Sequence, residues 1–390
     1  MKVPYIPGWR NRKSDAHSRR PLVPGPHDTA ALREEVLDAG LTPDRALQLA
    51  RASEDSGRFS EALELLTTAN RLRRDDIVER RLVRLRRRAF GCLDHSLPPP
   101  DWPPFVPENA PGATPGPPIV TADDLTVGVL RNGILRHGSV LVRGLVSSSR
   151  VERLRAIIDR AFDAYDRAQS DGAAPSVWFD PLDEVPKGDE TRRWARLGQG
   201  VLTGDSPRAL YEFLETVYET GVDRLIAAYF SERPALSLEK CTLRRADPEA
   251  QEAMERNAWE QGYRAISLWH QDGAFLGSGI RSVNAWFALS RCGRDAPGMD
   301  LLPMRLNRLI PTGEAGAGFG WTAAAETILR EVPGVEVWRP EFEPGDVLFF
   351  DHLMMHRTAS SPSMRHVRYA IESWFFAPSV YPQGSTPLLV

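Results

Sequence analysis

A histidine and a carboxylate stand two residues apart in the segment AISLWHQDG, which covers residues 265–273. The segment is rich in apolar and β-branched residues and is followed by glycine, a pattern that predicts a strand. Residues i and i+2 of a strand project from the same face, so His270 and Asp272 would offer an imidazole and a carboxylate from one support. Such a pair fits a metal site, although H-x-D triplets are also frequent by chance.

A second histidine, His356, completes a set of metal ligands. Residues 343–346 predict a turn, and the buried run that begins at Val347 is expected to continue as one strand to His356. Two imidazoles and one carboxylate can occupy one face of an octahedral iron(II) and leave three positions open. Two of these suit a bidentate 2-oxo acid and the third suits O2. His352 is the alternative ligand in this block.

A cationic group that can hold the far carboxylate of such an acid follows the second histidine. Arg368 opens the predicted strand RYAIESWFF, and a guanidinium beside the metal can bind a carboxylate through two hydrogen bonds. Thr358 can add a hydroxyl group. Arg365 competes for this role, but the strand context favours Arg368.

Residues on neighbouring strands are candidates for the wall of a pocket. Phe275 follows the H-x-D pair and Trp286 lies on the next predicted strand, so both are candidate substrate contacts, although aromatic side chains commonly fill a β core. Asn284 shares a strand face with Trp286 and is a candidate contact for the 2-oxo acid. A further strand alternates charged and polar residues on a face that we expect to meet water: Lys240, Thr242 and Arg244.

Residues 125–382 resemble the phytanoyl-CoA dioxygenase family, which includes the ectoine hydroxylases. The resemblance lies in WHQDG, NAWFAL, PGMDLLP, GDVLFFDHLMMHRT and the final R-x-A-I strand, in that order. It implies that iron is bound by His270, Asp272 and His356. It also implies that Thr358 and Arg368 bind 2-oxoglutarate, although the family often has serine at the first position and places its arginine about one residue closer to the histidine. Halogenating relatives carry a small residue in place of the metal carboxylate, so the resemblance favours hydroxylation.

Composition and charge exclude several other classes. The chain has 390 residues, 42% of them hydrophobic, and a formal net charge of −3, which gives no electrostatic reason to expect nucleic acid or a membrane surface as a partner. No run of apolar residues is long enough for a membrane span. Three widely spaced cysteines predict neither a disulfide framework nor a zinc site and favour a cytoplasmic location.

The chain divides into four predicted regions. Residues 1–27 predict a flexible basic tail, 28–96 a helical segment, 97–118 a proline-rich linker and 119–390 the dioxygenase domain. The helical segment resembles a single tetratricopeptide repeat, which cannot bury its own faces and is expected to pack on something else. The helix expected at 77–89 carries RRLVRLRRR, which we interpret as a solvated cationic face; the alternative is a docking surface for an acidic partner.

The dioxygenase region predicts helices first and strands later. Long amphipathic helices are expected at 149–167 and at 206–230, the latter with a break near Gly221. After Pro234, short strand-like runs alternate with turns: LSLEKCTLRR, AISLWHQDG, SVNAWFAL, EVWRPEF, DVLFFDH and VRYAIESWFF. The connections are too short for crossover helices, which favours antiparallel pairing. The expected fold class is α+β, a double-stranded β-helix (jelly-roll, cupin-like) core with bracing helices and an N-terminal helical segment.

These patterns together predict an iron(II)- and 2-oxoglutarate-dependent dioxygenase that uses O2 to hydroxylate an aliphatic C–H bond of a small molecule. Two alternatives remain at this point. One is a non-catalytic jelly-roll binding or scaffold protein, and the other is a metal dioxygenase that does not use 2-oxoglutarate. The N-terminal helices are a candidate contact for a protein partner or a carrier protein.

Overall fold

The computed structural model describes residues 42–93, 102, 116–183, 188–250 and 268–390. The predicted tail, residues 28–41 of the predicted helical segment and most of the predicted linker lie outside these ranges. None of the described helices has the length and apolar character needed to span a lipid bilayer.

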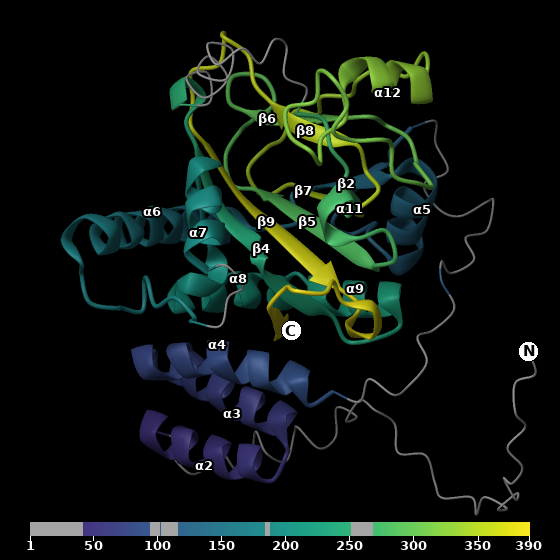
Figure 1. Ribbon diagram of the computed structural model, residues 1–390. Coiled ribbons are helices and arrows are strands. Elements are labelled where there is room, and N and C mark those ends of the chain that lie inside the picture. The colour runs from purple at the N-terminus through teal and green to yellow at the C-terminus, as the bar shows by residue number, and fades with distance from the viewer. Residues whose placement is uncertain (1–41, 94–101, 103–115, 184–187, 251–267) are drawn as a thin grey trace, which may run out of the picture.

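A large, mostly antiparallel sheet lies at the centre of the molecule (Figure 1). Its strands follow the order β1-β2-β7-β5-β9-β4-β10, with β3 paired to β4. The strands are β1 Ile119–Thr121, β2 Ser139–Arg143, β3 Gly200–Leu202, β4 Ala235–Ala246, β5 Ser282–Ala288, β7 Val347–Phe350, β9 Arg368–Phe376 and β10 Pro387–Leu389. A second, two-stranded sheet pairs β6 (Gly298–Leu301) with β8 (His356–Ala359). A major and a minor antiparallel sheet are consistent with the expected jelly-roll core.

The two faces of the large sheet have different neighbours because side chains alternate along each strand. On β5, Val283 and Phe287 belong to the core shared with the helices, whereas Trp286 belongs to a separate core shared with the minor sheet. We call the second face, turned toward β6 and β8, the inner face. The other face is covered by α5 (Val127–His137), α6 (Ser148–Asp171), α8 (Pro207–Glu219) and α9 (Val222–Phe230).

The two long helical segments expected in this region are present. The expected helix at 149–167 is α6, and the expected break falls at Gly221, whose φ of 71° lies in the left-handed region that glycine adopts without strain. Shorter elements complete the fold: α7 (Gly188–Leu197), α11 (Gly273–Leu276), α12 (Ala325–Glu331) and the 3₁₀ turns Thr203–Asp205 and Pro378–Val380. The run EVWRPEF is not a strand; Trp338 and Phe342 form only isolated bridges, to Leu301 and Cys292.

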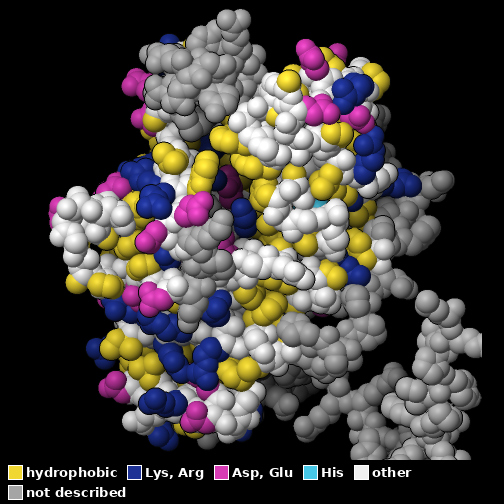
Figure 2. Space-filling model, viewed as in Figure 1, with side chains coloured by type: hydrophobic (Ala, Val, Ile, Leu, Met, Phe, Trp, Pro, Cys, Tyr) yellow, Lys and Arg dark blue, Asp and Glu magenta, His cyan; other side chains and the backbone are white. Residues whose placement is uncertain are grey.

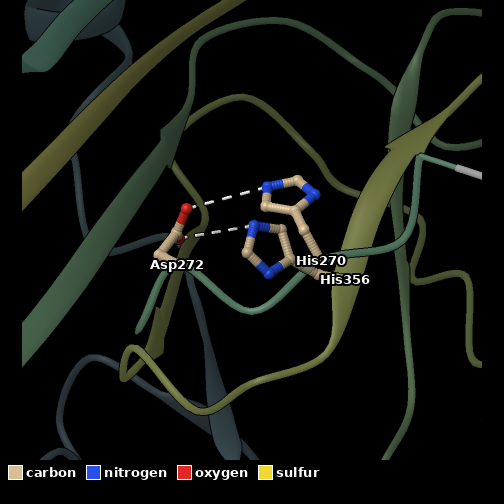
Figure 3. A group of neighbouring side chains, drawn as sticks. All are labelled: His270, Asp272 and His356. Carbon is tan, nitrogen blue, oxygen red and sulfur yellow. Dashed lines mark ion pairs between the residues drawn. The ribbon is translucent and has the colours of Figure 1, made fainter. Parts of the chain in front are cut away.

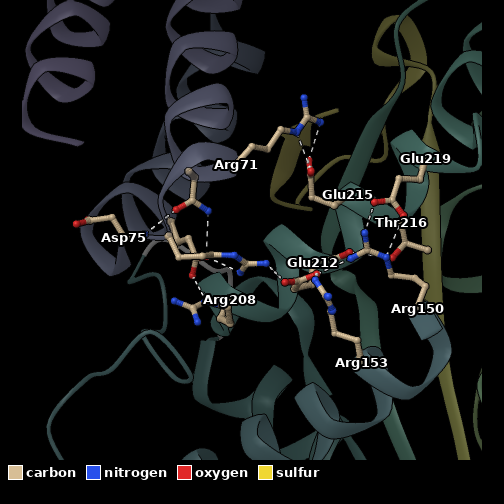
Figure 4. Close-up of polar contacts among 12 residues, drawn as sticks. Arg71, Asp75, Arg150, Arg153, Arg208, Glu212, Glu215, Thr216 and Glu219 are labelled. Carbon is tan, nitrogen blue, oxygen red and sulfur yellow. Dashed lines mark hydrogen bonds and ion pairs between the residues drawn. The ribbon is translucent and has the colours of Figure 1, made fainter. Parts of the chain in front are cut away.

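The N-terminal helices pack directly on the rest of the molecule, which we call the sheet region (residues 116–390). They are α2 (Pro43–Asp55), α3 (Phe59–Leu72) and α4 (Asp76–Gly91), and α4 contacts both α8 and β10. Tyr211 of α8 and Leu389 of β10 belong to the same apolar core as the helices. Figure 4 shows the polar contacts at this junction, where Arg71 binds Glu215 through two hydrogen bonds of 2.7 and 2.8 Å. The helices therefore bury their faces against α8 and β10, as a single repeat-like unit must.

The arginines of α4 are occupied within the molecule, which corrects the expectation of a purely solvated cationic face. Two of them bind Glu54 of α2, and two approach Asp180 of the sheet region. A further arginine, Arg86, is buried and donates to the carbonyl oxygen of Leu389 at 2.7 Å. The helix α4 thus links α2 on one side to the sheet region on the other.

Candidate metal centre

The two histidines and the carboxylate singled out in the sequence lie together on the side of the minor sheet (Figure 3). The Nε2 atoms of His270 and His356 lie 3.7 and 3.6 Å from the two carboxylate oxygens of Asp272. Their ligand atoms all lie within 4.8 Å of one another. A divalent metal bonded to each ligand at roughly 2.1 Å would hold adjacent ligand atoms about 3 Å apart, so these three fit one ion after a small contraction.

Backbone pairing brings the distant histidines together. His270 and His356 form an isolated antiparallel bridge, with reciprocal N–H···O bonds of 2.9 and 3.0 Å. The predicted continuous strand into His356 is wrong, because β7 ends at Phe350 and His356 opens β8 in the other sheet. The chain crosses from the large sheet to the minor sheet between Phe350 and His356, and this places His356 beside His270.

Asp272 reaches the centre by a different geometry from the one expected. Its backbone is helical (φ −63°, ψ −22°) and it precedes the single turn of α11, so the same-face argument for a strand does not apply. The N–H of Gly273 donates to the carbonyl of His352 at 2.9 Å and fixes this turn against the block that carries His356. A Cβ at position 273 would lie 3.0 Å from the His352 ring and 3.2 Å from its carbonyl oxygen, so glycine lets this turn pack closely on His352.

Both imidazoles are oriented for metal binding by local backbone carbonyls. Nδ1 of His270 lies 2.9 Å from the carbonyl oxygen of Leu268, and Nδ1 of His356 lies 3.0 Å from that of Met354. A carbonyl can only accept, so each Nδ1 carries the proton and each Nε2 presents its lone pair to the centre. Burial, with a smaller contribution from His356, lowers the pKa of His270 to about 4, which keeps this ligand neutral at pH 7.

His352, the alternative ligand, is engaged elsewhere. Its Nδ1 lies 3.0 Å from the Ser282 hydroxyl and its Nε2 lies 3.3 Å from the carbonyl of Ser278. It supports the turn that carries Asp272 and is not part of the three-residue group.

Arg368 lies on the inner face of the sheet with an incomplete set of partners. It is 4% exposed, and Nη1 donates to the carbonyl of Gly298 at 3.3 Å, whereas Nε is buried and has no partner among the described residues. Burial lowers its pKa, and the charge of Glu372 opposes that shift. Arg365 is exposed and donates to the backbone carbonyls of its own loop. Of the two candidate anchors, Arg368 is therefore the one that faces the interior.

The remaining predicted residues occupy different surroundings. Thr358 stands two residues after His356 on β8 and so projects from the same strand face. Asn284 is buried, and its Oδ1 has no partner among the described residues. Trp286 is 1% exposed, packs on Phe342 and lies 5.8 Å from the Arg368 guanidinium, so it flanks the candidate anchor. Phe275 is 40% exposed, and its ring centroid lies 6.4 Å from that of His270.

The charged face of β4 turns inward, contrary to expectation. Register shifts between Leu236 and Cys241, and a bulge of this kind reverses which residues face each side. Nζ of Lys240 therefore lies 4.3 Å from the Phe275 ring centroid, and Arg244 binds Glu372 of β9 at 2.7 Å.

Two further aromatic residues near the centre were not predicted as site residues. Trp321 meets the His270 ring edge-on at 5.1 Å, and Phe319 stacks on Trp321 at 5.2 Å. Both come from AGAGFGW, where aromatic residues among small ones in a loop were the available signal. Figure 2 shows a hollow in the molecule that is bordered by hydrophobic side chains, with acidic and basic side chains visible within it.

Comparison with known proteins finds similarity only at the level of structure. No protein-family model and no curated protein matches the chain. Among solved structures, the non-heme alpha ketoglutarate dependent carbocyclase SnoK from nogalamycin biosynthesis covers 69% of this chain and 98% of its own, with 16% identity and a TM-score of 0.42. EctD from S. alaskensis with 2-oxoglutarate and 5-hydroxyectoine covers 64% and 75%, with 13% identity and a TM-score of 0.39. AviO1 from Streptomyces viridochromogenes Tue57 covers 63% and 93%, with 16% identity and a TM-score of 0.37. At these values the chemistry of this chain has to be argued from its own residues.

Proposed function

We propose that this protein is an iron(II)- and 2-oxoglutarate-dependent dioxygenase of the phytanoyl-CoA dioxygenase type, and that it hydroxylates an aliphatic C–H bond of a small molecule. One observation carries the proposal: two imidazoles and one carboxylate converge, while the buried guanidinium of Arg368, whose Nε has no partner among the described residues, lies on the adjoining sheet face. The first group suits iron(II) and the second suits a carboxylate.

Each residue has a defined task in this proposal. His270, Asp272 and His356 would hold iron(II), which when bound supplies the activation of O2 and the oxidative decarboxylation of the 2-oxo acid. Arg368 would bind the far carboxylate of 2-oxoglutarate, with Trp286 packed beside it. The hydroxyl of Thr358 would donate to the same carboxylate. Asn284 would contribute its side-chain amide to the polar floor of this pocket.

Anaerobic titration with iron(II) and 2-oxoglutarate tests the proposal, because the chelate has a weak visible charge-transfer band. We expect a band in the wild type, none in His270→Ala, and a 2-oxoglutarate affinity weaker by roughly 10- to 100-fold in Arg368→Ala, since a hydrogen bond to a charged group contributes about 1.5–3 kcal/mol. Arg365→Ala is the matched control and should titrate like the wild type.

The other outcomes would support the alternatives. Iron binding without a band on addition of 2-oxoglutarate would favour a metal dioxygenase that does not use this co-substrate. Failure of the folded wild type to bind iron would favour a non-catalytic binding or scaffold protein.

A further inference from the structure

Four aromatic side chains form a continuous row from the metal centre to α7. We call them the aromatic row: Phe275, Trp321, Phe319 and Trp194. Trp321 contacts His270 and Phe275, with centroid distances of 5.1 and 5.5 Å. Phe319 stacks on Trp321 with only 4° between the ring planes, and Trp194 meets Phe319 edge-on at 5.9 Å. Three separate segments, α11, the loop before α12 and α7, therefore contribute to one surface.

The aromatic row is unusually open to solvent. Phe275 and Phe319 are each 40% exposed and Trp194 is 54% exposed. Aromatic rings are normally buried in a core, and contiguous exposed apolar surface on a soluble protein commonly marks a binding site. Flat rings present faces on which another ring can stack, with offset or edge-to-face contacts worth about 0.5–1.5 kcal/mol beyond the area buried.

Lys240 adds a cation at the inner end of the row. Its Nζ lies over the Phe275 ring at 4.3 Å, and among the described residues no hydrogen bond or salt bridge engages it. The acids with the largest electrostatic influence on it have other tasks. Asp272 is a proposed metal ligand, the Glu239 carboxylate accepts from the N–H of Thr386, and Glu372 binds Arg244.

Lys240 is the cation of this group that has no anionic partner among the described residues. Arg244 is matched by Glu372, and in the proposed function Arg368 is matched by 2-oxoglutarate. Lys240 is half-buried, so an anion supplied by a ligand would give it the ion pair that it lacks.

We propose that the substrate carries a planar ring system that lies on the aromatic row and an anionic group that pairs with Lys240. This identification of the substrate class rests on the proposed function. The Phe275 ring lies near both groups: its centroid is 6.4 Å from that of His270 and 4.3 Å from Nζ of Lys240. The anionic group and the oxidised carbon would therefore lie at the same end of the substrate.

Fluorescence titration of the full-length, iron-free protein with two naphthalene probes tests the proposal. The probes are 8-anilinonaphthalene-1-sulfonate, which is a planar anion, and N-phenyl-1-naphthylamine, which has the same rings without the charge. We expect Lys240→Met to weaken the sulfonate by roughly 10-fold or more and to leave the neutral probe unchanged. The double variant Trp194→Ala/Phe319→Ala should weaken both probes by roughly 2- to 10-fold.

A matched control removes an exposed apolar side chain elsewhere. Leu329 of α12 is 67% exposed and lies outside the row, so Leu329→Ala should bind both probes like the wild type. Circular dichroism melting of every variant checks that the fold is retained. Equal probe affinities in wild type, Lys240→Met and the double variant, all folded, would overturn the proposal.

The anaerobic iron titration of the wild type separates the two proposals. Probe binding that depends on Lys240 and the aromatic row, in a protein that forms no chelate, would overturn the 2-oxoglutarate-dependent assignment and leave a binding site for an anionic ring compound. If the chelate forms normally but Lys240→Met and Trp194→Ala/Phe319→Ala bind the probes like the wild type, only the proposed substrate class would be overturned.

Discussion

At the scale of single residues, the candidate metal centre depends on two short backbone contacts. Each ligand histidine directs its Nδ1 to the carbonyl of the residue two positions before it, Leu268 in one case and Met354 in the other. Ligand histidines commonly use a carboxylate, a carbonyl or water for this purpose, and the contact fixes the tautomer and the ring orientation. Here the orientation is set locally, so it requires no distant side chain and leaves no mark in the composition of the sequence.

Removing the hydroxyl group of Thr358 should measurably weaken the binding of 2-oxoglutarate. Replacing Thr358 by valine keeps the shape and removes the hydroxyl that we propose donates to 2-oxoglutarate, so the dissociation constant should rise by roughly 2- to 10-fold. Thr358→Ser keeps the hydroxyl and should remain near the wild type. The anaerobic titration measures both, and equal affinities for the valine and serine variants would exclude the hydroxyl as a contact.

The pair Arg244–Glu372 should influence the co-substrate without touching it. Burial raises the pKa of Glu372, but Arg244 and then Arg368 outweigh this and hold it below the ordinary value, so the group is a carboxylate at neutral pH. Without Arg244, this carboxylate would turn to Arg368 and compete with 2-oxoglutarate. We expect Arg244→Ala to weaken 2-oxoglutarate by roughly 10-fold.

The double variant Arg244→Ala/Glu372→Gln decides whether competition is the cause. Removing the charge of Glu372 frees Arg368 again, so affinity should recover most of the loss. A double variant as weak as Arg244→Ala would show instead that the single change disturbs the strand.

At the scale of elements, the sequence predicted which segments form strands more accurately than which face of the sheet each side chain lies on. The long runs of β5 and β9 and the amphipathic helix α6 follow periodicity and were correct. The bulge in β4 had a signal that the prediction did not use, because the apolar residues of LSLEKCTLRR change phase from Leu236 and Leu238 to Cys241 and Leu243. That reversal brings Lys240 inward and was the main error about the site.

The three predicted metal ligands lie together in the structure, although their local backbone structure differs from the prediction. Asp272 lies in a helical turn and His356 begins a strand of the other sheet, so neither follows the strand argument from which it was proposed. The bridge between His270 and His356 is a contact between distant segments, and single-sequence periodicity carries no signal for such a contact.

The link between α2 and α4 depends on Glu54. Its side chain is 1% exposed and forms ion pairs with Arg81 and Arg88 of α4. Glu54→Gln should lower the free energy of unfolding by about 1–3 kcal/mol, because it removes the buried carboxylate that both arginines bind. The loss is limited because both arginines are partly exposed and can be hydrated by water. Glu61→Gln, in the more open pair with Arg58, should cost less than about 1 kcal/mol. Urea unfolding of the two variants measures the difference, and equal losses would contradict this ranking.

At the scale of the whole molecule, the N-terminal helices form one packed structure with the sheet region. Tyr211 and Leu389 lie in their apolar core, and the arginines of α4 are engaged on both sides. A carrier or protein partner for these helices remains a prediction, and it would have to use their outward faces. Deleting the helices would expose α8 and β10, so lost turnover after deletion would not by itself identify a partner. Unfolding should proceed as one transition for both parts.

Alkaline pH provides a test of this junction through Tyr211. Burial raises the pKa of Tyr211 to about 12, whereas in the unfolded chain it is close to 10. Between these values the folded protein retains a proton that the unfolded chain has lost, so stability falls as pH rises through this window, by at most about 2.7 kcal/mol. Tyr211→Phe cannot lose a proton there. Its free energy of unfolding should therefore fall less than that of the wild type between pH 10 and 12, while the difference between the two proteins stays constant below pH 9. Parallel curves across the whole range would mean that Tyr211 is accessible to water and that the helices do not seal this face of α8.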